Sequence, residues 1–131
     1  MNEEFIWKAS MLERQSQETQ NKIEFVNQQI AELMQFQDSL NYFNDSDQKQ
    51  ILASLGKGVY VKANLENKDL FVEVGSGVIV KKKSSDMNDI INDQIRKFTE
   101  VRTHLIAEFE SYNKSLQSLV KEIEEANKSK S

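Results

Sequence analysis

The chain has 131 residues, a net charge of −4 and a pI near 5.1, and 38% of its residues are hydrophobic while 29% are charged. This balance disfavours a large globular core and favours an extended structure with long solvated helix faces. The 17 basic residues are scattered among 21 acidic ones, which disfavours nucleic-acid binding, and without cysteine there is no disulfide, thiolate nucleophile or cysteine-ligated zinc.

The N-terminal segment carries Glu3 and Glu4 where a signal peptide would have a basic region followed by an apolar run. No apolar stretch reaches the 18 or so residues that a membrane-spanning helix needs. We therefore expect a soluble, unprocessed protein, and the lack of cysteine suits a reducing cytoplasm.

The first predicted element is a helix over about residues 3–43. Side chains recur there at alternating spacings of three and four residues, the heptad pattern of a coiled-coil seam. The seam consists of Phe5, Ala9, Leu12, Ser16, Thr19, Ile23, Val26, Ile30, Leu33, Gln37 and Leu40. Because three of these positions are polar, we expect weaker burial and some breathing in that helix. The polar cluster at residues 44–47 then ends it.

The second predicted element is a β segment over about residues 50–83, which contains all four glycines. Its strands are expected at Gln50–Leu55, Val59–Leu65, Leu70–Val74 and Val78–Lys82. The polar residues 66–69 are interpreted as a hairpin turn between the second and third strands. Four short strands cannot bury both faces alone, and their open edges invite pairing with another chain. The expected assembly residues are Leu55, Val59, Val61, Ala63, Leu70, Val72, Val74, Val78 and Val80.

The last predicted element is a helix over about residues 85–127, with Ser84 and Ser85 as candidate N-caps. Asp86 and Asp89 would complement the helix dipole in its first turn. The second seam, stronger than the first, consists of Ile91, Ile95, Phe98, Arg102, Leu105, Phe109, Tyr112, Leu116, Leu119, Ile123 and Ala126.

Each seam covers about 35 residues, or roughly 50 Å at 1.5 Å per residue. Equal lengths favour an intrachain antiparallel hairpin over pairing with other chains, with Leu40 near Ile91 and Phe5 near Ile123. The predicted fold class is therefore α+β: a long antiparallel coiled coil of two helices, joined by about four short strands that form an oligomerisation platform. We expect residues 1–131 to form a single domain.

No motif in the sequence supports catalysis or a cofactor. The pairs Gly56/Gly58 and Gly75/Gly77 lack the spacing of a phosphate-binding loop and are better explained as strand turns. His104, the only histidine, falls off the seam and is interpreted as a surface residue. The aspartates at positions 86, 89 and 93 fit helix capping better than metal binding, and the lysines at 81–83 fit a solvated junction. We expect no enzyme activity, no cofactor and no bound metal.

The free ends of the two helices carry more apolar residues than a two-stranded seam can bury. Ile6, Trp7 and Met11 crowd the first turns beside Phe5, and Val120 lies beside the second seam near Ile123. Surplus apolar surface of this kind can form a binding site, and tryptophan and methionine suit contact with varied partners. From the residues alone, these side chains are explained equally well if they close the end of the coiled coil or pack on a neighbouring subunit.

The order helix, glycine-punctuated strands and helix resembles the α-class subunit of prefoldin, over essentially the whole chain. The resemblance is most specific over residues 52–82, which include the segments LASLGKG and VGSGV. The β-class subunits of that family have one shorter hairpin and no insertion like residues 59–74.

The resemblance implies an ATP-independent cytoplasmic co-chaperone, a hexamer of two α-class and four β-class subunits that delivers unfolded proteins to a group II chaperonin. The β segments would build the platform from which the coiled coils project. The coil tips would hold the client chains, which favours client binding at Phe5, Ile6, Trp7, Met11, Val120 and Ile123. The alternative is a coiled-coil spacer or tether that oligomerises through its β segment.

Overall fold

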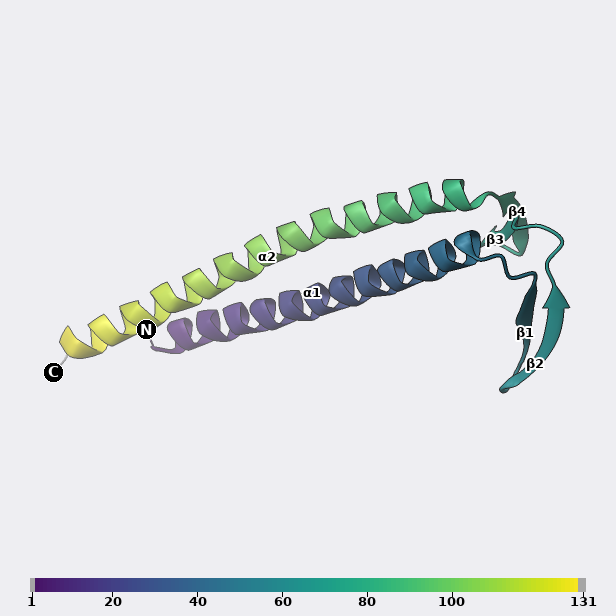
Figure 1. Ribbon diagram of the computed structural model, residues 1–131. Coiled ribbons are helices and arrows are strands. Elements are labelled where there is room, and N and C mark those ends of the chain that lie inside the picture. Colours follow the sequence, from purple (N-terminus) through teal and green to yellow (C-terminus); the bar gives the residue numbers. More distant parts are fainter. Residues whose placement is uncertain (1, 130–131) are drawn as a thin grey trace. The chain divides into compact units, whose positions relative to one another are not determined.

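The computed structural model describes residues 2–129. In chain order it contains α1 (Asn2–Asp45), β1 (Gln50–Gly56), β2 (Val59–Asn64), β3 (Leu70–Gly75), β4 (Val78–Lys82) and α2 (Ser84–Ser129) (Figure 1). The predicted α+β fold class, with two long helices joined by four antiparallel strands, is confirmed. No helix within residues 2–129 combines the length and the apolar character needed to cross a membrane.

The described residues form two compact units. The helical unit contains residues 2–32 of α1 and 95–129 of α2, whereas the strand unit contains residues 33–94. The strand unit therefore holds the end of α1, all four strands and the start of α2. The assignment of residues 1–131 to a single domain stays a prediction.

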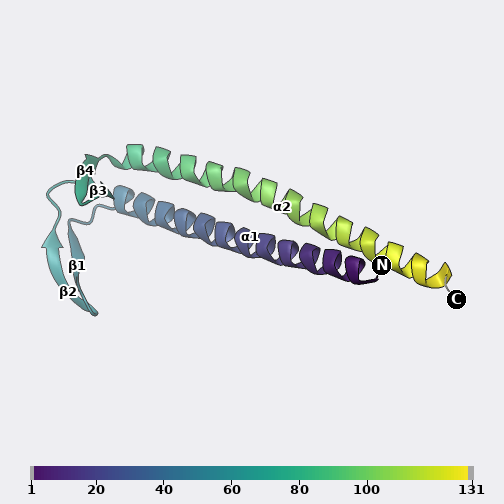
Figure 2. The ribbon, with the colours of Figure 1, turned by 180° about the vertical axis from the view of Figure 1, so that it is seen from behind.

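The helical unit is an antiparallel helix pair, and Figures 1 and 2 show its two helices side by side. Its buried residues are Val26, Ile30 and Leu119, together with Thr19. All four belong to the predicted seams. Their heptad spacing keeps one stripe of each helix turned toward the other, so the core of this unit is a narrow strip along the helix interface.

Hydrogen bonds between polar side chains join the two helices of the helical unit and define their register. Ser16 Oγ donates a hydrogen bond to Asn113 Oδ1 at 3.1 Å, and Arg102 Nη1 donates to Asn27 Oδ1 at 3.0 Å. Eleven residues separate the two partners on each helix, as an antiparallel pair requires. These bonds give the polar seam residues Ser16 and Arg102 partners on the opposite helix.

The helix ends in the strand unit are joined in the same way. Gln37 Nε2 donates to Asn92 Oδ1 at 2.6 Å and to Asn88 Oδ1 at 3.4 Å, and Asn88 Nδ2 donates to Asn41 Oδ1 at 3.2 Å. Leu40 and Ile91, which the sequence predicts to be neighbours, are both buried, and Ile91 is fully inaccessible to solvent. The polar Gln37 therefore sits within a bonded network beside an apolar layer.

The strands pair differently from the prediction. β1 pairs with β2 and β3 pairs with β4, as two separate antiparallel hairpins, so the predicted hairpin turn at residues 66–69 is wrong. The two hairpin turns are at residues 57–58 and 76–77, so the interpretation of the glycine pairs as strand turns is confirmed. Lys57 and Ser76 there have φ of 52° and 50°, and the following glycines have φ of 79° and 75°. Positive φ at both central positions matches the right-handed twist of the flanking strands. Residues 66–69 link the two hairpins.

The predicted N-caps of α2 are also wrong. α2 begins at Ser84, and the Met87 amide donates to the Lys83 carbonyl at 3.1 Å, so Lys83 occupies the N-cap position. The Ser84 hydroxyl is buried and has no hydrogen-bond partner within the described residues.

At the other end of the strand segment, α1 ends at Asp45 inside the predicted polar cluster, and the Gln48 amide donates to Ser46 Oγ.

Candidate functional site

An open groove of about 620 Å³ lies in the helical unit, near the start of α1 and the end of α2. Its apolar lining comes from Trp7, Met11 and Leu12 on α1 and from Leu119 on α2. Leu12 and Leu119 are seam residues, so the floor of the groove is continuous with the core of the helix pair.

The groove exists because large side chains on α1 face small ones on α2. Trp7 and Met11 are one helical turn apart and share a face, whereas the α2 side carries Ser115 and Ser118. The serines leave Trp7 largely uncovered, with 63% of its surface exposed. An indole held at the edge of an open, apolar-floored groove is suited to contact with an apolar segment of another chain.

Charged side chains border this apolar floor. Lys8 on α1 and Lys114 and Glu122 on α2 line the groove, and Lys8 Nζ lies 3.5 Å from Glu4 Oε1. Since these charged groups are exposed, they contribute little to the stability of the fold. Their effect is on which segments of another chain can enter the groove. The groove thus combines an apolar floor with a mixed-charge rim.

The predicted tip residues fall into three groups. Trp7 and Met11 line the groove; Ile6 and Val120 are exposed but lie outside its lining; and Phe5 and Ile123 are half-buried on the seam. Around α1, the other lining residues of this helix lie on one side of Trp7, whereas Ile6 lies about 100° to the opposite side, which places it outside the groove. The structure therefore brings only part of the predicted set into one cavity.

Sequence reasoning missed the α2 side of the groove. Ser115 and Ser118 are three residues apart on one helix face, but a polar pair of this kind gives no signal until the register places it opposite Trp7 and Met11.

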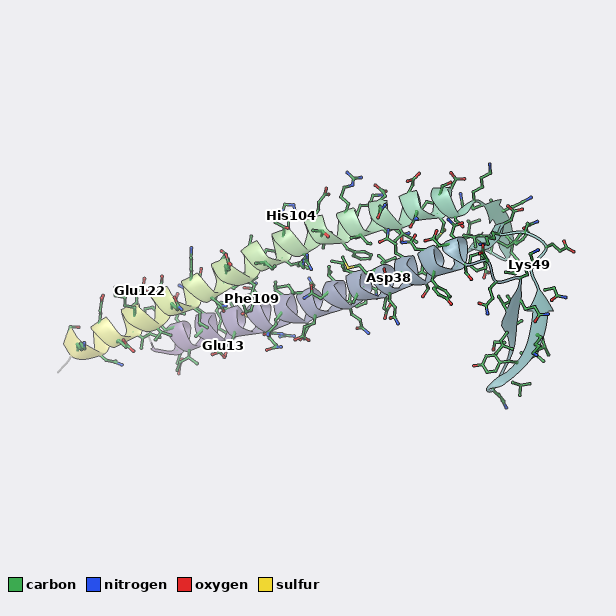
Figure 3. The ribbon with its side chains drawn as sticks, in the orientation of Figure 1. Glu13, Asp38, Lys49, His104, Phe109 and Glu122 are labelled. Atoms are coloured by element: carbon green, nitrogen blue, oxygen red, sulfur yellow. The ribbon has the colours of Figure 1, made fainter. Side chains whose placement is uncertain are left out.

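The interpretation of His104 as a surface residue agrees with its exposure. Figure 3 shows it pointing away from α1, whereas Phe109 lies between the two helices.

The strand hairpins form a second candidate surface, one for assembly. Directly paired residues of an antiparallel hairpin share a face. In β1–β2, Val61 pairs with Ala53 and Ala63 pairs with Ile51, which gives one apolar face. In β3–β4, Val72 pairs with Val80. The predicted assembly residues are exposed or half-buried in the described chain: Leu55, Val59, Val61, Ala63, Leu70, Val72, Val74, Val78 and Val80.

The opposite face of each hairpin mixes apolar with polar and charged residues, and the sequence interpretation mostly overlooked its apolar ones. Leu52 and Tyr60 lie on the second face of β1–β2, and Phe71 and Ile79 lie on the second face of β3–β4. Phe71 is 70% exposed. Contact with one further sheet on the apolar face would leave the apolar side chains of the mixed face exposed.

The described residues contain no cluster of three or more histidine, cysteine, aspartate or glutamate side chains arranged to hold a metal ion. The groove and the hairpin faces can bury apolar surface against another chain, with exposed charges around it.

A family model described as prefoldin subunit matches residues 12–129. The chain belongs to the prefoldin family. The match covers α1 from Leu12 onward, all four strands and α2, so membership rests on the whole architecture and not on the coiled coil alone.

Three curated relatives carry the same family name. The chain is 26% identical over 84 residues to prefoldin subunit alpha of Methanosphaera stadtmanae, which covers 64% of this chain and 61% of that protein. It is 28% identical over 78 residues to prefoldin subunit alpha 2 of Thermococcus kodakarensis, covering 59% and 55%. It is 26% identical over 107 residues to prefoldin subunit alpha of Methanobrevibacter smithii, covering 81% and 73%. The predicted α class is confirmed, although the chain spans less than two thirds of the first two relatives.

Among solved structures, the chain is similar to filamentous PFD from Methanocaldococcus jannaschii, determined by cryo-electron microscopy. The TM-score is 0.72, the sequence identity is 21%, and the match covers 93% of this chain and 99% of that one. At this identity the similarity shows the prefoldin fold alone.

Proposed function

We propose that this prefoldin subunit is an ATP-independent holdase that binds unfolded client proteins at the groove end of its coiled coil. The observation that carries the proposal is the groove itself, where Trp7 and Met11 remain exposed above the apolar floor of Leu12 and Leu119. Burial of apolar surface favours binding of an unfolded segment and needs neither nucleotide nor covalent chemistry. The predicted client site also includes Ile6 and Val120, which are exposed beside the groove.

The proposed assembly is a hexamer of two α-class and four β-class subunits, built on the strand hairpins. The support is the family membership and the exposed apolar faces of both hairpins. Delivery of clients to a group II chaperonin in the cytoplasm completes the proposed pathway, and no step of it calls for a catalytic group on this chain.

The client site is tested by replacing Ile6, Trp7 and Met11 with serine. A matched control replaces Met34, Tyr42 and Ile106, which are also exposed apolar residues but lie outside the groove. We expect the groove variant to assemble normally and to lose most of its ability to suppress aggregation of a denatured client, while the control retains that ability. Undiminished suppression by an assembled groove variant would contradict the site.

Assembly is tested by Val61→Glu together with Val72→Glu, because a carboxylate on an apolar sheet face costs several kcal/mol if it is buried without a partner. Lys62→Glu, on the other face of β2, is the control. After co-expression with a β-class subunit, we expect native mass spectrometry to show a hexamer for the control and a dissociated helical subunit for the double variant. A hexamer from the double variant would refute assembly through these faces, and an open-ended homo-oligomer would refute the stoichiometry.

The rival function is a spacer or tether that oligomerises through its strands. The same aggregation assay separates the two, because a spacer gains nothing from exposed groove residues. If the wild-type assembly does not slow aggregation of a denatured client, the holdase function is wrong and the spacer is favoured.

A further inference from the structure

The groove end of the helical unit has a second flank, which lies outside the groove. Asn27 of α1 and Asn113 of α2 mark this flank, because both make hydrogen bonds that cross the helix pair. Ile6 lies three heptads before Asn27, and Val120 lies one heptad after Asn113. A coiled coil repeats its faces every seven residues, so Ile6 and Val120 belong to the same flank as the two asparagines.

The register of the helix pair brings Ile6 and Val120 close to each other along the helix axis. Ser16 bonds to Asn113 at 3.1 Å, which fixes the level of the two helices there. Seven residues nearer the end of the unit, Val120 is therefore level with Ala9. Ile6 is three residues from that level, or about 4.5 Å along α1. Ile6 is 64% exposed and Val120 45% exposed, so the seam does not cover them.

Four carboxylates surround this apolar pair. Each heptad places two positions on the flank: the one that Ile6 or Val120 occupies, and the one three residues before it. Over residues 3–20 and 110–127, these positions contain no lysine or arginine. They contain four exposed glutamates, at Glu3, Glu13, Glu110 and Glu124. We call this surface, with Ile6 and Val120, the acidic flank.

The glutamates of the acidic flank have no ion-pair partner among residues 2–129, unlike two of those on the groove side. Glu4 Oε1 lies 3.5 Å from Lys8 Nζ, and Glu18 Oε1 lies 3.4 Å from Arg14 Nε. Arg14 also borders the acidic flank, but its guanidinium group is already paired with Glu18. The flank therefore presents uncompensated negative charge.

The groove end is acidic even when all of its basic residues are counted. Lys121 and Lys128 lie on the outer edge of α2, and the four glutamates of the flank outnumber them. Residues 2–18 and 108–129 together hold nine acidic and five basic side chains, whereas residues 19–107 hold twelve and eleven. The negative charge of the chain is thus concentrated at the end that carries the exposed apolar residues, and this charge attracts basic partners.

An open groove of about 550 Å³ gives the acidic flank room for a segment of another chain. Leu116 supplies apolar lining, and Glu13 and Ser16 lie at the same groove. A segment seated there would contact Leu116 with an apolar side chain and would reach Glu13 with a basic one.

We propose that the acidic flank binds unfolded client segments in which lysine or arginine alternates with apolar residues, so that this holdase favours positively charged clients. The inference rests on the proposed holdase function and names the charge class of its clients. Apolar residues of the segment pack on Ile6 and Val120, and its basic residues pair with the four glutamates.

Charge disfavours the other occupants of this surface. A second copy of the chain, bound through the same flank, would place four carboxylates opposite four others. Nucleic acids and anionic lipid headgroups are repelled for the same reason. A segment that carries basic side chains gains Coulomb energy at each glutamate, and like charge on a competing segment removes that gain.

The experiment uses the full chain and two synthetic peptides of about 12 residues with equal numbers of leucines. One peptide carries four lysines and the other four glutamates, and binding is measured by fluorescence anisotropy of a dye on the peptide. In about 50 mM salt, we expect the lysine peptide to bind at least tenfold more tightly. In about 500 mM salt most of this difference should vanish, because salt screens exposed charges. Equal affinities at low salt would overturn the inference.

The flank itself is tested by a quadruple variant with Glu3→Gln, Glu13→Gln, Glu110→Gln and Glu124→Gln. The matched control removes the same charge from exposed glutamates elsewhere, with Glu32→Gln, Glu66→Gln, Glu73→Gln and Glu100→Gln. We expect the flank variant to bind the lysine peptide about tenfold more weakly, and the control to stay within about twofold of wild type. An unchanged affinity in the flank variant, or an equal loss in the control, would refute the flank as the binding surface.

Failure of this inference is distinguishable from failure of the holdase function. If the assembled protein suppresses client aggregation but binds both peptides equally, the inference falls and the proposed function stands. If it neither suppresses aggregation nor binds the lysine peptide, both fall. A folded protein with a pI of about 10 is the third probe: binding as tight as that of the lysine peptide, lost in the flank variant, would assign the flank to folded basic partners and overturn the client segment.

Discussion

Lys68 caps the end of a helix that lies more than twenty residues before it in sequence. The last turn of α1 has no basic side chain, and Ser46 and Asp47 follow it where a glycine cap would be usual. Lys68 Nζ donates to the Asn44 carbonyl at 2.8 Å and also to the Ser46 carbonyl. The ammonium group therefore supplies both the missing donor and the positive charge that a helix C-terminus favours.

Replacement of Lys68 by methionine keeps the apolar stem and removes both hydrogen bonds. A hydrogen bond to a charged group contributes about 1.5 to 3 kcal/mol, and the dipole interaction adds about 0.3 to 1 kcal/mol. Asn44 is exposed and Ser46 half-buried, so water replaces much of the loss. The expected destabilisation is about 1 to 2 kcal/mol. With a urea m-value of about 2 kcal/mol/M, the midpoint should fall by about 0.5 to 1 M.

The assay is urea unfolding followed by circular dichroism at equal protein concentrations, because assembly makes stability concentration-dependent. Lys62→Met is the control; Lys62 is an exposed strand lysine, and its variant should stay within about 0.5 kcal/mol of wild type. Amide hydrogen exchange at residues 42–46 should accelerate in the Lys68 variant and not in the control. If both midpoint and exchange are unchanged, Lys68 does not cap α1.

Three further substitutions follow from the packing and the turns. Ile91→Ala removes a fully buried side chain and should cost about 2 to 4 kcal/mol in urea unfolding, whereas a cost below about 1 kcal/mol would show that this layer is not packed. Gly77→Ala meets no atom within 4 Å but forces φ of +75° on alanine, so the thermal midpoint should fall by the equivalent of about 1 kcal/mol. Gln37→Ala removes the hydrogen bonds to Asn88 and Asn92 and should lower the free energy of unfolding by about 1 kcal/mol. Increased stability of this variant would show that the network destabilises the fold.

The helices could be predicted from the sequence because a heptad pattern repeated over many turns leaves little ambiguity. The seam residues Val26, Ile30 and Leu119 are buried where the spacing predicts. The polar seam positions were harder to interpret, because spacing alone cannot show that Ser16 and Gln37 have partners on the other helix. The breathing expected of α1 therefore leaves out the hydrogen bonds that Ser16 and Gln37 make to α2.

The strand pairing was less predictable because two kinds of turn signal compete. The polar residues 66–69 favour a hairpin turn, and the Asp69 amide does donate to Asn67 Oδ1 in a local turn. The pairing is set instead by Gly58 and Gly77, which allow the tight turns that match strand twist. The groove was hidden for another reason: its α2 wall includes Ser115 and Ser118, whose role depends on what the antiparallel register places opposite them.

In the proposed holdase, client binding at the groove would depend on assembly through the hairpin faces. Full burial of a side chain such as Met11 stabilises a contact by about 1.5 to 3 kcal/mol, and an open groove delivers only part of that. Association costs about 4 kcal/mol or more in lost freedom, so a single groove with two or three apolar contacts would hold an unfolded segment only weakly. Several grooves carried on one platform turn later contacts into intramolecular ones and raise avidity without tightening any single site. The Val61→Glu, Val72→Glu variant, with its groove intact, should therefore suppress aggregation far less than the assembled protein at equal subunit concentration. Equal suppression would mean that one groove is sufficient and that the platform serves another purpose.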